Sequence, residues 1–119
     1  MTSVQHAGLS AERFARFSRG QQLLTIANEM NRASKLFQPD DHQRLGRAYE
    51  RVLALVDLAV EVSDSRSLRR ELLRWRDLVA EQYVSELPDP QAHARAFRAL
   101  LQLHPETWRQ LPYVTGAAR

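Results

Sequence analysis

Apolar residues recur every three or four positions through most of the chain, which is the spacing of a helix that buries one side. The longest such run covers residues 45–62, where leucine and valine also occupy positions outside the main stripe. A helix that is apolar on several sides needs several neighbours. Charged residues such as Arg47, Glu50 and Asp57 interrupt this run too often for a membrane span. The pattern therefore predicts an all-α fold in which this helix is surrounded by others.

Capping residues and prolines divide the rest of the chain into further helices. Ser18, with Gln21 three residues later, forms a capping box, and Pro39 with Asp40 separates the second helix from the third. Asp89 and Pro90 start a fifth helix in the same way. The expected helices cover about residues 11–17, 19–37, 40–62, 67–87, 90–103 and 105–111.

Short turns between long helices favour antiparallel neighbours. We therefore expect an up-and-down four-helix bundle with short additional N- and C-terminal helices. The expected domain covers residues 10–111, between flexible segments at residues 1–9 and 112–119. Gly46, inside the third helix, is expected to mark the close approach of another backbone.

The composition narrows the possible functions. The chain has 119 residues and no cysteine, so thiolate metal sites, disulfides and cysteine nucleophiles are excluded. Its 17 basic and 14 acidic residues are mostly interleaved, and a net charge of +3 does not by itself indicate nucleic-acid binding. No export signal or membrane span is evident, so we expect a cytoplasmic protein with no membrane partner.

No motif for catalysis or for a cofactor is present. The Glu-x-x-His pairs of di-metal bundles are missing, and the glycines are isolated rather than clustered as in phosphate-binding loops. The nearest approach to a metal cluster is Asp40, Asp41 and His42, to which we assign a helix-capping role. We expect no cofactor and no metal.

The second helix carries an unusually polar side. Asn28, Asn31 and Arg32 fall within two turns, and asparagine is a poor residue for a helix interior. This side is either a solvated surface with a Glu29–Arg32 pair or a recognition surface for a partner or an anion.

The fourth helix carries the densest basic cluster, in which Arg66, Arg69, Arg70 and Arg74 share a face. They are placed to bind an anion, RNA or an acidic protein. Alternatively, they pair with Asp57 and Glu61 of the preceding helix, because the arginines lie at the helix end that prefers anions. The same helix has a stripe predicted to be buried, Leu68, Leu72, Trp75, Val79 and Tyr83, and a second apolar stripe beside it, Leu73, Ala80, Val84 and Leu87.

One spacing late in the chain resembles a known family. Arg98 is followed six residues later by His104, which is similar to the arginine–histidine spacing of small helical HEPN ribonucleases. The resemblance implies RNA cleavage by Arg98 and His104, but a chain this rich in arginine yields such a spacing by chance, and His104 before Pro105 is better interpreted as the start of the last helical turn. Ala99 departs from the pattern, because that family usually has a polar residue directly after the arginine.

We expect a non-enzymatic interaction module that either associates with itself, as a homodimer, or binds a protein partner. Trp108 and Tyr113 support this expectation, since a small bundle has little surface to cover such large side chains. The alternative is an RNA- or anion-binding helical domain, with HEPN-like chemistry at Arg98 and His104.

Overall fold

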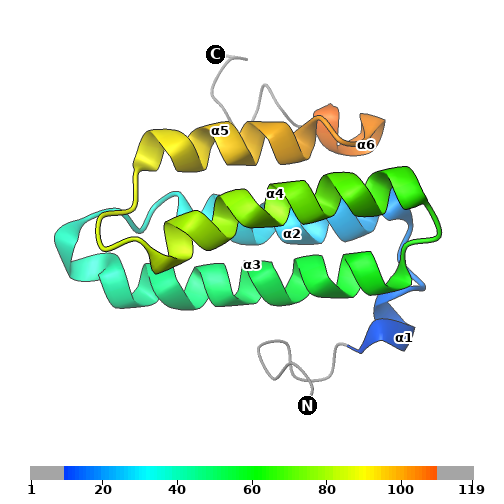
Figure 1. The fold of residues 1–119 in the computed structure, drawn as a ribbon, viewed down its shortest axis with the longest axis horizontal. Coiled ribbons are helices and arrows are strands. Elements are labelled where there is room, and N and C mark those ends of the chain that lie inside the picture. The colour runs from blue at the N-terminus through cyan, green and yellow to red at the C-terminus, as the bar shows by residue number, and fades with distance from the viewer. Residues whose placement is uncertain (1–9, 110–119) are drawn as a thin grey trace.

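The computed structural model describes residues 10–109, which form six α-helices and one 3₁₀ helix. In chain order these are α1 (Ala11–Phe14), α2 (Arg19–Ala33), the 3₁₀ helix η1 (Pro39–Asp41), α3 (His42–Val62), α4 (Arg66–Val84), α5 (Pro90–Leu101) and α6 (Pro105–Trp108). The long helices α2 to α5 run side by side (Figure 1). Helix α1 packs against α3, and α6 packs against α2 and α5.

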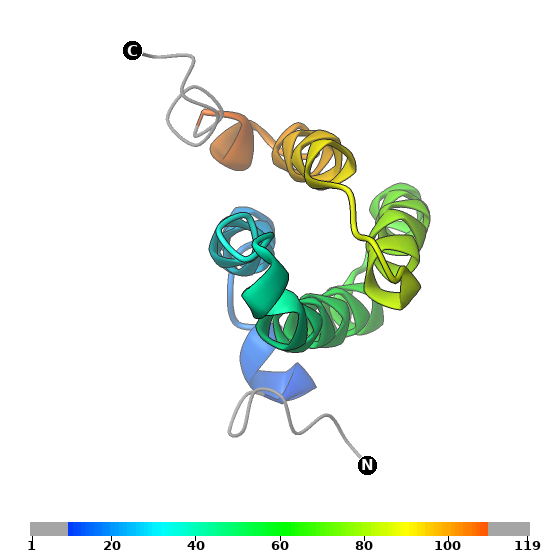
Figure 2. The same ribbon diagram turned by 90° about the vertical axis from the view of Figure 1, so that its left-hand side faces the viewer.

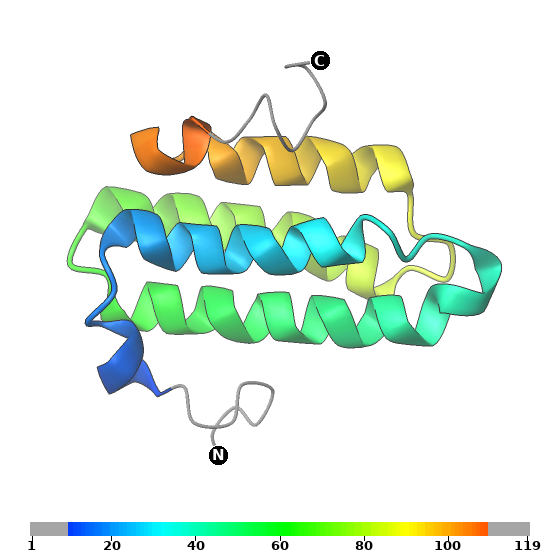
Figure 3. The same cartoon turned by 180° about the vertical axis from the view of Figure 1, so that it is seen from behind.

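Viewed along their axes, α2, α3, α4 and α5 surround a common centre (Figure 2). Each packs against the next, and α5 closes the ring by contacting both α4 and α2. Helix α2 is therefore diagonal to α4, and α3 to α5. Seen from behind, α2 lies in front of α4, with α3 and α5 on either side (Figure 3). The predicted all-α, up-and-down four-helix bundle is confirmed.

Helix α3 supplies much of the core, as its pattern predicts. Val52, Leu55 and Val56 are fully buried in its middle turns. Leu53 and Leu58, outside the main stripe, are partly buried against the same core. This agrees with the expectation that residues 45–62 have companion helices on more than one side.

The predicted starts of helices are mostly confirmed. Ser18 accepts a hydrogen bond from the Gln21 backbone N–H, and the Gln21 side chain accepts one from the Ser18 N–H, which completes the capping box. The start of α3 differs from the prediction, because η1 precedes it and Asp41 rather than Asp40 occupies the N-cap. Asp41 is buried and forms an ion pair with Arg44 instead of capping.

Several helices end earlier than the sequence predicts. Helix α2 ends at Ala33 rather than near Phe37, and Leu36 and Phe37 pack on the core from the connection that follows. Helix α4 ends at Val84, which leaves Leu87 in the loop. Apolar residues at helical spacing therefore continue past the helix in both places. The predicted flexible ends and the last residues of the predicted terminal helix lie outside the described residues.

The two helical glycines have different surroundings. A Cβ at Gly46 would meet nothing within 4 Å, so the predicted close approach of a backbone there is wrong. Gly20, in contrast, lies against α6, where a Cβ would come within 1.9 Å of the Glu106 carboxylate. The close approach that requires a glycine is therefore between α2 and α6. Among the described residues, no helix is long and apolar enough to cross a membrane.

Candidate functional site

Helix α4 presents apolar side chains to solvent on the side turned away from the bundle. Leu73 is 47% exposed, Val84 75%, and Leu87 in the following loop 87%. At 3.6 residues per turn, Leu73, Ala80 and Val84 lie on one line along the helix. We call Leu73, Ala80, Val84 and Leu87 the α4 outer face. The second apolar stripe of the fourth helix therefore forms a surface rather than part of the core.

The opposite side of α4 is held firmly in the bundle. Leu72, Trp75 and Val79 are buried, and the Trp75 indole N–H donates to the Ala96 carbonyl of α5 at 2.7 Å. The predicted buried stripe is wrong at its last member, because Tyr83 is exposed and Gln82 takes the buried position. These contacts fix which side of α4 faces solvent.

One flank of the outer face is engaged with α3. The Arg76 guanidinium donates two hydrogen bonds to the Asp57 carboxylate, at 2.7 and 3.3 Å, and Asp57 raises the pKa of Arg76. The Tyr83 hydroxyl donates to Glu50 at 2.7 Å, which raises the pKa of Tyr83. Both residues therefore join α4 to α3.

The other flank carries charges that face solvent. Arg70, Arg74, Asp77 and Glu81 follow one another along this side of α4 and are all exposed. We call these four residues the free flank. Arg74 pairs with Glu71 of its own helix at 3.3 Å, and the remaining three form no ion pair within residues 10–109. Basic groups come first on this flank and acidic groups second.

The predicted charge pairing across the α3–α4 turn is wrong in its partners. Asp57 binds Arg76 rather than Arg66, Arg69 or Arg70. The Arg69 guanidinium donates a hydrogen bond to the Ser63 backbone carbonyl at 2.6 Å. This cation therefore satisfies a carbonyl group at the C-terminal end of α3. Arg66 and Arg70 are exposed and have no acidic partner in the described part of the chain.

The polar side of α2 is partly buried. Glu29 is only 6% exposed and accepts hydrogen bonds from Arg32 at 3.1 Å and from Arg51 of α3 at 3.0 Å. The predicted Glu29–Arg32 pair is confirmed, whereas the expectation of a solvated position for Glu29 is wrong. Asn28 is exposed and Asn31 half-buried, both away from α4 on the other side of the ring. The structure does not bring them together with the arginines of α4.

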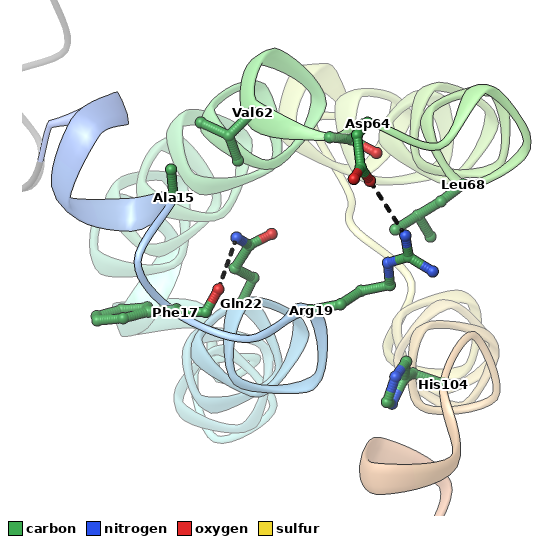
Figure 4. Close-up of a pocket in the computed structure, with 9 residues that line it drawn as sticks. Ala15, Phe17, Arg19, Gln22, Val62, Asp64, Leu68 and His104 are labelled. Carbon is green, nitrogen blue, oxygen red and sulfur yellow. Dashed lines mark hydrogen bonds and ion pairs between the residues drawn. The ribbon is translucent and has the colours of Figure 1, made fainter.

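A pocket of about 460 Å³ opens at the end of the bundle where α2, the α3–α4 turn and the start of α6 meet. Arg19 forms an ion pair with Asp64 across it at 3.3 Å, and His104 lies on another wall (Figure 4). His104 Nδ1 accepts the backbone N–H of Glu106 and so caps α6. Gln22 donates to the Phe14 and Phe17 carbonyls. Most polar groups of this pocket are therefore engaged in structural contacts.

A second pocket, of about 280 Å³, lies between the end of α2 and the start of α5. Arg98 lines this pocket, together with Phe37, His93 and Phe97. His104 lines the other pocket. The Arg98–His104 pair suggested by the ribonuclease-like spacing is thus divided between two pockets.

The bundle encloses a buried polar network that sequence reasoning missed. The Tyr49 hydroxyl and His93 Nδ1 are 2.8 Å apart, and His93 Nε2 lies 2.9 Å from the Met30 carbonyl. Gln82 donates to the Tyr49 hydroxyl at 3.4 Å and to the Asp89 carbonyl at 2.8 Å. Burial raises the pKa of Tyr49 to about 12 and lowers that of His93. The spacing of the sequence could have identified His93 as a buried residue, since it continues the apolar stripe of Ala96, Phe97 and Leu100.

The polar groups of this network satisfy one another, although His93 also lines the 280 Å³ pocket. Residues 10–109 also contain no group of three or more histidine, aspartate or glutamate side chains that could hold a metal ion. No known family model, curated protein or solved structure matches the chain. The α4 outer face and its free flank remain the strongest candidate for a functional surface.

Proposed function

We propose that this protein is a non-enzymatic interaction module that binds a protein surface through the α4 outer face. The exposure of Val84 and Leu87 carries the proposal, because large apolar side chains in solvent favour association. Leu73 extends the same surface toward the start of α4. Single exposed apolar residues are common on monomers, whereas a line of them along one helix is typical of helix docking.

The rigid attachment of α4 supports this role. Hydrogen bonds from Trp75 to α5 and from Arg76 to α3 hold the helix on both sides. A partner would therefore meet a preformed surface, and association would cost little ordering of the helix itself.

Binding of RNA along this helix is less well supported. A phosphate backbone that followed α4 from Arg66 and Arg70 would next meet Asp77 and Glu81, which repel it. Arg69 and Arg74 already have partners within the protein. A protein surface with charges of both signs suits this helix better.

Site-specific photo-crosslinking in the host cell tests the proposal. A photoreactive amino acid replaces Ala80, in the middle of the outer face, and in a second protein replaces Asn28, an exposed residue of α2. We expect a defined protein adduct from position 80 and none of comparable yield from position 28. Leu73→Ser with Val84→Ser should abolish the adduct while the far-UV circular dichroism stays unchanged.

Equal adduct yields from positions 80 and 28, or an adduct at position 80 that survives the two serine substitutions, would overturn the proposal. So would a strictly monomeric protein that forms no adduct and binds RNA with an affinity falling steeply with salt.

A further inference from the structure

The free flank carries its charges in two blocks, basic first and acidic second. Arg70 and Arg74 lie in the N-terminal half of α4, and Asp77 and Glu81 lie in its C-terminal half. Of the four, only Glu81 lies in a terminal turn, where the helix dipole favours cations. Each like-charged pair is four residues apart, a spacing at which the two charges repel, whereas Arg74 and Asp77 are three residues apart and attract. The flank therefore has two repelling pairs and one attracting pair along its own helix.

Within residues 10–109 this arrangement is compensated only in part, by the charge of Asp77 acting on Arg76, whose pKa Asp57 and Asp77 together raise. Arg70, Asp77 and Glu81 form no ion pair within residues 10–109, and the Arg74–Glu71 pair is exposed at both ends. On the opposite flank, Arg76 and Tyr83 both have partners on α3. The unpaired charges are thus confined to the side of α4 from which a partner could approach the outer face.

We infer that the partner is a second copy of this chain, whose α4 packs antiparallel against the first. This inference rests on the proposed function and names the partner for that surface. Two antiparallel helices bring the basic half of one flank beside the acidic half of the other, and the two helix dipoles also attract. The required complement is present on the chain itself, which favours a second copy over an unrelated protein.

One register satisfies all four charges of the flank. In this register Arg74 faces Asp77 of the second copy. Arg70 then faces Glu81 of the second copy, because Arg70 lies four residues before Arg74 and Glu81 lies four residues after Asp77. In a two-fold contact each pair occurs twice, so four ion pairs form. In an antiparallel two-fold contact, the free flanks of the two helices lie on the same side of the interface. Their charged residues can therefore reach one another.

The helical part of the outer face, from Leu73 to Val84, fits this register as well. Leu73 comes to lie beside Ala80 of the second copy, where the small side chain leaves room for a leucine. Val84 comes to lie beside the alkyl parts of Arg66 and Arg70. A contact through one helix per copy is small compared with stable interfaces, so we expect a reversible, concentration-dependent dimer.

Charge reversal on the full-length chain tests the pairing. An acidic variant carries Arg70→Glu and Arg74→Glu, and a basic variant carries Asp77→Arg and Glu81→Arg. In a homodimer of either variant, charges of the same sign face each other across the contact. We therefore expect the dimer Kd from light scattering to rise by about tenfold or more. Mixed together, the two variants are complementary and should form a heterodimer.

A matched control changes the net charge by the same amount elsewhere. Arg47→Glu with Arg95→Glu alters two exposed arginines of α3 and α5 and should leave the dimer Kd unchanged. Thermal unfolding of every variant, monitored by circular dichroism, shows that the fold persists. The quadruple variant with all four flank charges reversed restores complementarity, so it should dimerise and provide a second check.

The relative direction of the helices is testable because the sequence has no cysteine. In the proposed register, Asp77 of one copy is offset from Asp77 of the other by only about 4.5 Å along the helices. Asp77→Cys should therefore form a disulfide-linked dimer. Arg66→Cys should not link to itself, because the offset is about 28 Å, but should link to a Val84→Cys protein. Parallel helices would link Arg66→Cys to itself.

The outcomes separate this inference from the proposed function. A wild-type protein that stays monomeric at all concentrations yet crosslinks another protein at position 80 overturns the second copy and leaves the interaction surface intact. A dimer whose Kd is unchanged by the flank reversals, or whose Arg66→Cys form links to itself by a disulfide, overturns the antiparallel charge pairing. Loss of any adduct at position 80 overturns both.

Discussion

Tyr49 and His93 are joined by a 2.8 Å hydrogen bond in the interior of the bundle, although they lie on the diagonal helices α3 and α5. A backbone carbonyl only accepts hydrogen bonds, so His93 Nε2 donates to the Met30 carbonyl of α2, and His93 Nδ1 accepts a hydrogen bond from the Tyr49 hydroxyl. This fixes the neutral tautomer of the imidazole. The pair therefore connects three of the four helices of the bundle.

Removal of the Tyr49 hydroxyl should destabilise the protein. Tyr49→Phe leaves His93 Nδ1 without its donor in a buried site, and an unsatisfied buried polar group costs about 1–3 kcal/mol. Denaturant unfolding measures this loss directly. Tyr83→Phe is the matched control, because that hydroxyl bonds to Glu50 at the surface and its loss should change stability little. Equal effects of the two substitutions would contradict a structural role for the buried network.

The stability of the protein should fall on acidification through the titration of His93. Burial lowers the pKa of His93 in the folded state below its usual value of about 6.5. The unfolded chain therefore binds the proton more tightly. The contribution of His93 is fully present above about pH 6.5 and is lost as the pH falls toward and through the lower folded-state pKa.

Unfolding free energies measured from about pH 7.5 down to about pH 5 test this effect. His93→Gln should lower stability at neutral pH and flatten the dependence on pH in this range. A His93→Gln protein whose stability still falls as steeply on acidification as that of the wild type would contradict the assignment to His93. A wild-type stability that rises on acidification would contradict the argument.

The architecture was largely predictable because it depends on periodicity and on caps. Residues 45–62 carry apolar side chains around much of the helix, and the structure surrounds this segment with α1, α2 and α4. The Ser18 capping box is a local signal, and it forms as predicted. Helix ends were less predictable, because Leu36 and Phe37 keep the helical spacing but pack on the core from a loop.

The side-chain pairs were poorly predictable because they depend on the rotation of each helix. Sequence spacing places Asp57 near the arginines of α4 but does not determine that Arg76 is the partner. Tyr83 and Gln82 are neighbours in sequence, and a small rotation of α4 decides which is buried. Polar residues such as His93 are recognised as core members only when burial is known.

Glu29 should contribute more to stability than a carboxylate in a similar pair at the surface. Glu29 is buried and forms ion pairs with both Arg32 and Arg51. Glu71 forms an exposed ion pair with Arg74. The Glu29–Arg32 and Glu71–Arg74 pairs are comparable, because each joins residues three positions apart in one helix. Hydrogen bonds to buried charged groups contribute about 1.5–3 kcal/mol, and exposed pairs much less. We therefore expect Glu29→Gln to lower the denaturation midpoint clearly and Glu71→Gln to change it little. Similar midpoints for the two variants would contradict the bridging role of Glu29.

The two helical glycines should respond oppositely to alanine. A Cβ at Gly46 has open space around it, so Gly46→Ala should stabilise the protein by up to about 1 kcal/mol through the better helix propensity of alanine. At Gly20 the same Cβ would lie 1.9 Å from the Glu106 carboxylate and 2.9 Å from its Cβ, so α6 must shift and stability should fall. Chemical denaturation of both variants measures the contrast. Adding Glu106→Ala to Gly20→Ala should recover part of the loss, and a Gly20→Ala protein as stable as Gly46→Ala would show that α6 does not pack there.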